Sequence, residues 1–202
     1  MPAQTKAHRL QGIVEADETY FPDSCKGQRH LDRPARKRGH PIYARGTGKG
    51  QIPVSVVRDR SGATADFKLR AADTTEIVPP LRALLAQDAV LCTDGASVYR
   101  AVAKKLGVTH RAINLSAGIR GIAGVYHVQN VNAYDSRLKG WMERFHGVAT
   151  KYLENYLRWR RELERWGPNN SPQLGLYTAR GWESQFQLLT QTQPTFINGT
   201  EH

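Results

Sequence analysis

The chain has 202 residues, 40% of them hydrophobic, and 29 Lys and Arg residues against 18 Asp and Glu give a formal net charge of +11. This length and apolar content exclude a wholly disordered chain, and the lack of any apolar run of about 18 residues predicts that no helix spans a membrane. We expect neither a signal peptide nor a disulfide framework, because no apolar segment follows the first residues and only Cys25 and Cys92 are present. The positive charge favours a polyanionic partner, most simply nucleic acid.

The first third of the chain predicts one strand and one basic loop. Residues 1–11 are short and polar, so we expect a disordered lead. The segment Gly12–Phe21 is rich in β-branched and aromatic residues, which predicts a strand on which Glu15 and Asp17 share one face. Residues 26–50 are rich in Lys, Arg, Gly and Pro and poor in apolar residues, which predicts an inserted basic loop.

The remaining segments alternate between strand and helix patterns. We expect strands at 52–58, 63–69, 89–93 and 109–115, and helices at 73–87, 97–106, 132–145 and 150–166. Strands in a hairpin, followed by alternating helices and strands, are typical of an α/β domain whose mixed sheet carries helices on its faces. This domain would span residues 12–166, with a C-terminal extension at 167–202.

Two carboxylates lie at positions that disfavour a charged side chain unless it has a function. Asp17 lies inside a strand pattern, and Asp94 follows the end of one, where α/β sheets bind ligands. Two neighbouring carboxylates repel each other unless a cation lies between them, and Mg²⁺ prefers such oxygen ligands. Two alternatives are structural: Asp94 begins an ordinary Asp-Gly turn, and Asp17 faces water on an edge strand.

A third ligand would come from the helix that Asn132 opens. Lys139 follows seven residues later on the same face, so an amide oxygen could bind the cation while the ammonium contacts a DNA phosphate. The alternatives are that Asn132 caps the helix and that Lys139 is solvated. Asp135 would either be a metal or water partner or, as we favour, be solvated or paired with Lys139.

Several segments, in this order, resemble the ISXO-like insertion-sequence transposases. They are Val14–Tyr20, Arg36–Gly39, Val54–Ala63, Thr93–Tyr99, Val131–Lys139, Phe145–Leu153 and Tyr156–Arg160. The resemblance extends over residues 12–165. It implies a ribonuclease-H-like catalytic domain, which has the same order of strands and helices, with a helical C-terminal extension.

The resemblance also implies an activity and a set of site residues. Asp17, Asp94 and Asn132 would form the catalytic triad and hold two Mg²⁺ ions, with Mn²⁺ as a substitute, and Lys139 would act beside them. The enzyme would use water to cut a DNA strand at the end of the mobile element. The freed 3′-hydroxyl would then attack target DNA.

The chain departs from the family pattern at its beginning. The family usually has a zinc ribbon and a helix-turn-helix before the first aspartate, but only a short lead precedes Asp17, and no Cys-x-x-Cys pair is present. We therefore expect a catalytic portion alone. The alternatives are a truncated, inactive remnant that still binds DNA and, more remotely, an unrelated basic RNA-binding protein.

The basic residues and the partners complete the predictions. The predicted DNA contacts are Lys26, Arg29, Arg36, Lys37, Arg38, Arg45, Lys49 and Lys139, directed mainly at phosphates. Element ends and target DNA would be the partners of a homo-oligomer in the cytoplasm, associated with the nucleoid. We expect Trp141, Trp159 and Trp166 in the core and favour a structural role for His127.

Overall fold

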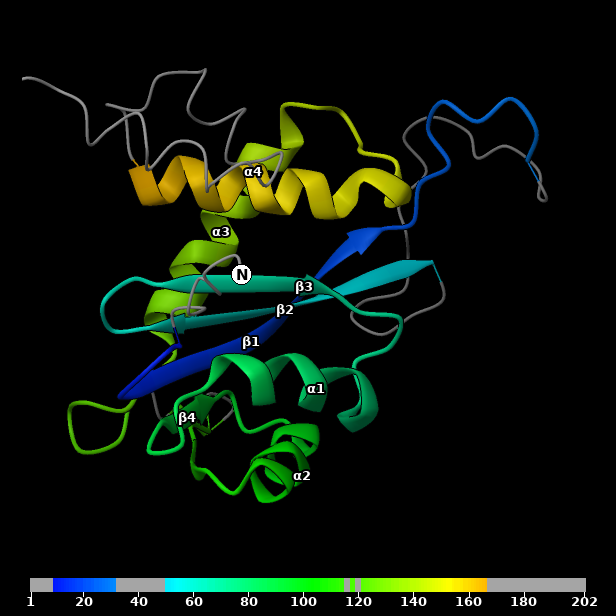
Figure 1. Cartoon of the computed structure of the whole chain (residues 1–202). Helices are drawn as coiled ribbons and strands as arrows, with labels where there is room; N and C mark the ends of the chain where they lie inside the picture. The colour runs from blue at the N-terminus through cyan, green and yellow to red at the C-terminus, as the bar shows by residue number, and fades with distance from the viewer. Residues whose placement is uncertain (1–8, 32–49, 115–116, 119–120, 167–202) are drawn as a thin grey trace, which may run out of the picture. The chain divides into compact units, whose positions relative to one another are not determined.

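A mixed five-stranded sheet forms the centre of the fold (Figure 1). The computed structural model describes residues 9–31, 50–114, 117–118 and 121–166. The strands, in chain order, are β1 (Ile13–Pro22), β2 (Gln51–Asp59), β3 (Thr64–Lys68), β4 (Val90–Thr93) and β5 (Thr109–Ala112). Their order across the sheet is β3-β2-β1-β4-β5, with β2 antiparallel to β1 and β3, and β4 parallel to β1 and β5. This α/β arrangement was expected and is compatible with the ribonuclease-H-like fold.

Helices pack on both faces of the sheet (Figure 1). The helical elements are α1 (Thr74–Leu84), α2 (Ser97–Leu106), α3 (Gln129–Glu143), the 3₁₀ turn η2 (Thr150–Tyr152) and α4 (Leu153–Trp166). Side chains of α1 and α2 form one buried cluster with strand residues such as Val14 and Leu91. Side chains of α3 and the first residues of α4 form a second cluster with Val54 and Cys92 on the other face.

The chain divides into two compact units, residues 1–157 and 158–202. The boundary lies inside α4, whereas the sequence suggested a change after residue 166. In the second unit, the described residues continue α4, where Arg160 pairs with Glu164 at 2.7 Å, one turn later.

The first helix ends earlier than the sequence predicted because its last residues pair with the beginning of the chain. Leu85 adopts an extended conformation, and Leu10 forms a parallel bridge with it. Leu10 is 3% exposed and belongs to the first buried cluster. The expectation of a disordered lead up to residue 11 is therefore wrong at Leu10.

The third helix begins three residues earlier than predicted, at Gln129. Asn132 consequently lies inside the first turn, where its backbone N–H donates to the Val128 carbonyl at 3.1 Å.

The three tryptophans expected in the core have different outcomes. Trp141 packs against the second cluster, but Trp159 is 39% exposed, so its prediction as a core residue is wrong. The Trp166 side chain lies outside the described ones.

Candidate active site

The sheet brings Asp17 and Asp94 next to each other. β1 is the central strand, and Ala16 is paired with Thr93 in the register of β1 and β4. Asp17 and Asp94 each follow one member of that pair, so the two carboxylates meet at the carboxyl end of β4. The alternative that Asp17 sits on an edge strand is wrong, because β1 has a neighbour on each side.

Burial and mutual repulsion disfavour ionisation at this point of the sheet. Burial, with a smaller contribution from the negative charge of Asp94, raises the pKa of Asp17 to about 6. The Glu18 backbone N–H at 2.8 Å and the charge of Lys139 oppose this increase. Asp135 has a pKa of about 7 for the same kinds of reason, with burial first and the charge of Asp17 second. A bound cation would relieve this repulsion.

Asp94 holds a tight turn that leads into α2. Its Oδ1 accepts the Ala96 backbone N–H at 3.0 Å. Gly95 has φ of +91°, a conformation that side chains with a Cβ rarely adopt. The turn predicted as a structural alternative therefore exists, and it fixes the Asp94 carboxylate beside Asp17 through one oxygen only.

The helix α3 presents three polar side chains along one edge of its buried face. Asn132, Asp135 and Lys139 are spaced by three and four residues and so lie above one another. Asp135 is buried, Asn132 is half-buried and Lys139 is exposed. The charge of Lys139 acts on Asp17, and the charge of Asp17 acts on Asp135, so this edge of α3 lies near Asp17.

A buried carboxylate, Glu15, fixes the start of α3. Its side chain is fully buried and accepts the backbone N–H groups of Asn130 and Val131 at 2.8 and 3.0 Å. The Asn130 side-chain amide donates to the other oxygen at 3.0 Å, and Arg60 pairs with that oxygen at 2.6 Å. A helix N-terminus stabilises a negative charge, so Glu15 holds α3 from β1, two residues before Asp17.

His127 belongs to the same network. Its Nδ1 lies 3.4 Å from a Glu15 oxygen, and its Nε2 lies 2.8 Å from Nη1 of Arg60. Arg60 also donates to the Val125 carbonyl at 2.6 Å. The structural role favoured for His127 agrees with this placement. We call Glu15, Arg60, His127 and Asn130 the Glu15 network.

A second anchor holds the middle of α3. The Tyr134 hydroxyl donates to Asp66 of β3 at 2.8 Å, and both residues are buried. Val131, Leu138 and Met142 enter the second cluster from the same helix. The helix that bears Asn132 and Lys139 is thus fixed at its start and along its length.

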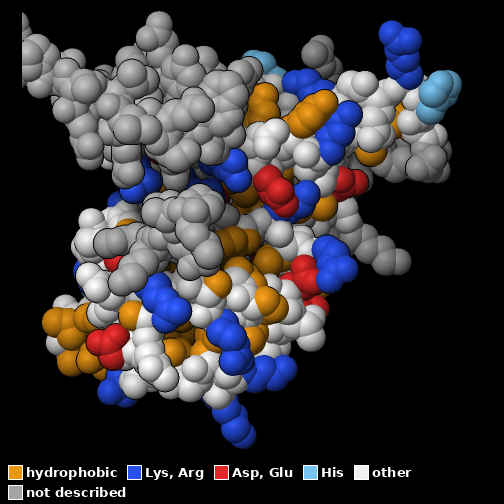
Figure 2. Space-filling model, in the orientation of Figure 1, with side chains coloured by type: hydrophobic (Ala, Val, Ile, Leu, Met, Phe, Trp, Pro, Cys, Tyr) orange, Lys and Arg blue, Asp and Glu red, His pale blue; other side chains and the backbone are white. Residues whose placement is uncertain are grey.

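The basic residues predicted to bind DNA are only partly within the described chain. Lys26 is exposed, and its Nζ donates to the Phe145 and Gly147 carbonyls at 2.9 and 2.8 Å, beyond the end of α3. Arg29 is also exposed, and Arg36, Lys37, Arg38, Arg45 and Lys49 lie outside the described residues. On the face drawn in Figure 2, the Lys and Arg side chains of the described residues are spread out with Asp and Glu between them, so these residues form no single basic patch there.

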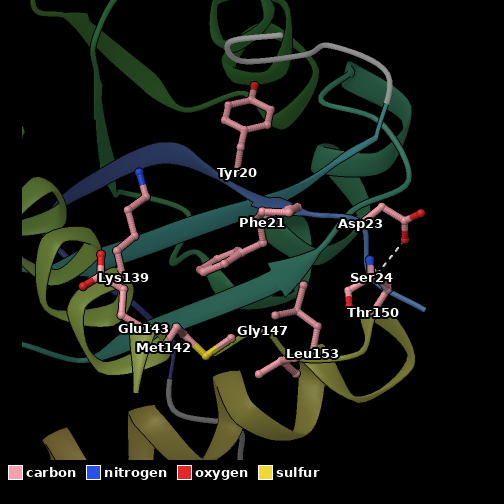
Figure 3. Close-up of a pocket in the computed structure, with 12 residues that line it drawn as sticks. Tyr20, Phe21, Asp23, Ser24, Lys139, Met142, Glu143, Gly147, Thr150 and Leu153 are labelled. Carbon is pink, nitrogen blue, oxygen red and sulfur yellow. Dashed lines mark hydrogen bonds between the residues drawn. The ribbon is translucent and has the colours of Figure 1, made fainter. Parts of the chain in front are cut away.

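A cavity of about 550 Å³ lies between the end of β1 and the second half of α3. Its apolar walls include Phe21, Met142 and Leu153, and Lys139 and Glu143 also line it. In Figure 3 the Phe21 ring points toward Met142, while Tyr20 points to the opposite side of the strand. Lys139 therefore borders this cavity and also acts on Asp17 and Asp135. We call Asp17, Glu18, Asp94 and Asp135 the acidic group.

One family profile matches this chain. The profile of the ISXO2-like transposase domain covers residues 9–161, most of the described residues. The chain belongs to this transposase family. No curated protein matches it at a significant level. Membership makes the protein an insertion-sequence transposase, an enzyme class that cleaves DNA, and the family resemblance found in the sequence is confirmed. In the described part of the transposase, no helix is long and apolar enough to cross a membrane.

The oxygen-rich donor set of this transposase domain fits a hard divalent cation. Asp17, Asp94 and Asn132 supply two carboxylates and an amide oxygen, which are ligand types that Mg²⁺ accepts. Among the described residues, no group of three or more His, Cys, Asp and Glu side chains could hold an ion. A third protein ligand would have to be of another type, such as the Asn132 amide.

Sequence reasoning missed two features of the transposase site. The first is the Glu15 network, although a charged residue within the apolar strand pattern Ile13–Ala16 was a signal that the side chain has buried partners. The second is Asp135, for which we had favoured a solvated or Lys139-paired side chain. It is only 7% exposed, and no ion pair in the described chain joins it to Lys139, so that interpretation is wrong.

Proposed function

We propose that this transposase domain cuts and joins DNA strands with two divalent ions, Mg²⁺ or Mn²⁺, held by Asp17, Asp94 and Asn132. The observation that supports this most directly is the pair of aspartates that the sheet register places side by side, with the pKa of Asp17 raised by burial and by Asp94. When bound, the ions would supply Lewis acidity to the attacking and leaving oxygens of a phosphodiester displacement.

The proposed activity consists of two reactions, strand cleavage and strand transfer, whose reacting groups are held by side chains of this domain. In the first, a water oxygen attacks phosphorus at the element end and the bond to the 3′ oxygen breaks, which leaves a 3′-hydroxyl and a 5′-phosphate. In the second, that hydroxyl attacks a phosphodiester of the target and displaces a 3′ oxygen there. Lys139 binds a phosphate oxygen near the cut bond, since its charge acts on Asp17 and it borders the cavity.

DNA recognition in this proposal is mainly electrostatic. The formal charge of +11 favours phosphate contacts, which give strong binding that carries little sequence information. Lys26, Arg29 and Lys139 are the described residues assigned to these contacts. Lys26 would contact phosphate with the same ammonium group that donates to the Phe145 and Gly147 carbonyls just after α3.

The test is a nicking assay with a supercoiled plasmid that carries the coding sequence and its flanking DNA. We expect nicking in Mg²⁺ or Mn²⁺ that disappears with EDTA or with Asp94→Asn. Binding without nicking under every condition would overturn the catalytic proposal and would favour the inactive DNA-binding remnant. A nick that persists in Asp94→Asn would point to a contaminating nuclease and overturn the assigned site.

A further inference from the structure

Asp135 is a buried carboxylate that lacks a partner for one of its oxygens. The residue is 7% exposed, and its Oδ1 makes no hydrogen bond. Buried polar atoms are almost always hydrogen-bonded, because an unsatisfied one costs about 1–3 kcal/mol. Oε1 of Glu18 shares this property, so the surroundings of each side chain must show what its oxygen could meet.

The surroundings of Asp135 point to a cation. It lies one turn after Asn132 on the same edge of α3, and the charges of Asp17 and Glu18 both disfavour its ionised form. The charge of Lys139 favours the ionised form of Asp135, but the described residues contain no ion pair between the two. The unsatisfied oxygen therefore belongs to the acidic group rather than to a surface pair.

The described carboxylates are not arranged to coordinate one metal ion all together. The described Asp and Glu residues form no group of three that could hold an ion. Mg²⁺ keeps several of its water molecules when it binds to a protein. Carboxylates that hydrogen-bond such ligands from a second layer orient them, and their loss typically weakens metal affinity about 10–100-fold.

Resting on the proposed function, we propose that Asp135 is a positioning residue that accepts hydrogen bonds from the hydration water of the divalent ion bound by Asp17 and Asp94. In this role it holds water in place beside Asn132. The partner that its Oδ1 lacks is then supplied by the hydrated ion.

Glu18 provides a matched comparison for this role. It too interacts with Asp17 and Asp94, and burial raises its pKa to about 7. Strand alternation turns it to the opposite face from Asp17, on the side of Tyr99 of α2. Its Oε1, like Oδ1 of Asp135, makes no hydrogen bond. Glu18→Gln therefore also removes one negative charge near Asp17 and Asp94, but from the strand β1 and not from α3.

The experiment measures Mn²⁺ binding to metal-stripped protein by isothermal titration calorimetry. We expect Asp135→Asn to weaken Mn²⁺ affinity about tenfold or more, and Glu18→Gln to weaken it clearly less. An affinity of Asp135→Asn within about twofold of the wild type would overturn the inference, and so would an equal loss in both variants. Asp135→Ser serves as a second variant if the amide does not fold.

The outcomes separate this inference from the proposed function. If Asp17→Asn abolishes Mn²⁺ binding while Asp135→Asn leaves it intact, the role of Asp135 is refuted and the metal site stands. If the wild-type protein binds no Mn²⁺ and does not nick DNA, the proposed function fails first.

Discussion

Two carboxylates on one face of β1, Glu15 and Asp17, have opposite surroundings. Glu15 is fully buried and accepts three N–H groups besides its ion pair with Arg60. Asp17, two residues later, receives one backbone N–H and faces Asp94. The first is a satisfied structural anchor, whereas the second is held in a place where its charge is unfavourable. The contrast teaches that hydrogen-bond partners, rather than burial alone, distinguish the structural carboxylate of Glu15 from the one that we propose binds a metal ion.

The largest effect that would test this contrast concerns activity at Asp17. We expect Asp17→Asn to reduce nicking at least about 1,000-fold, because in our proposal Asp17 holds the metal ions that stabilise the transition state. The same variant should unfold at an equal or higher temperature without metal, since it removes repulsion with Asp94. Thermal denaturation and nicking rates check both parts, and a strongly destabilised Asp17→Asn would contradict the comparison.

The second effect concerns stability at Glu15. Glu15→Ala should lower the free energy of unfolding by about 3 kcal/mol, because it removes the acceptor of three N–H groups at the buried start of α3. Glu15→Gln should lose less, as its amide oxygen still accepts from Asn130 and Val131. Urea denaturation measures both variants. A Glu15→Ala protein as stable as the wild type would show that the Glu15 network does not anchor α3.

The third effect is a dependence of stability on pH in the absence of metal. Burial raises the pKa of Asp17 from 3.8 to about 6 and that of Asp135 from 3.8 to about 7. The folded protein then binds more protons than the unfolded chain between about pH 4 and 7, so these two residues make stability fall as pH rises.

Thermal scans in EDTA at pH 5 and pH 8 check this sign. The contribution of Asp135 is isolated by Asp135→Asn, whose melting temperature should fall less between the two pH values than that of the wild type. Mn²⁺ should raise the melting temperature more at pH 8 than at pH 5, because protons compete for the ligands. Equal pH dependence in wild type and variant would contradict the placement of Asp135 in the acidic group.

The smallest effect concerns Lys139, the positive charge that acts on Asp17. Lys139→Gln should weaken plasmid binding only a few-fold and reduce the slope of log affinity against log salt by about one. Filter binding over a salt series measures the slope. An unchanged slope would show that Lys139 does not contact phosphate.

The sheet could be predicted from sequence because its signals are local. The β-branched pattern of β1, the Asp59–Gly62 turn and the Asp73 helix start each depend on neighbouring residues, and all three are present in the structure. The end of α1 could not be predicted in this way. It depends on Leu10, whose pairing with Leu85 joins segments far apart in the chain.

The candidate site divides along the same line. Asp17 and Asp94 were found because each stands at a recognisable place in a strand pattern. The start of α3 was placed three residues late, since Val128 and Gln129 carry no usual capping side chain and Glu15 supplies the acceptor from a distant strand. Asp135 was misjudged because its sequence spacing to Lys139 suggested a surface pair, and only the packing of α3 on the sheet removes it from water.

The point where the basic loop leaves the domain has a consequence for how this protein can vary. The Asp23 backbone N–H donates to the Gly50 carbonyl at 2.8 Å, and Ser24 is joined to Thr150 by two further bonds at 2.9 Å. The chain thus leaves and re-enters the sheet through one closed base. Since doubling the length of a loop costs only about 0.6 kcal/mol, segments of different length and charge could replace residues 27–49 while the sheet and the contacts of Ser24 and Lys26 stay intact. The segment that we propose contacts DNA can then change while Asp17 and Asp94 keep their places in the sheet.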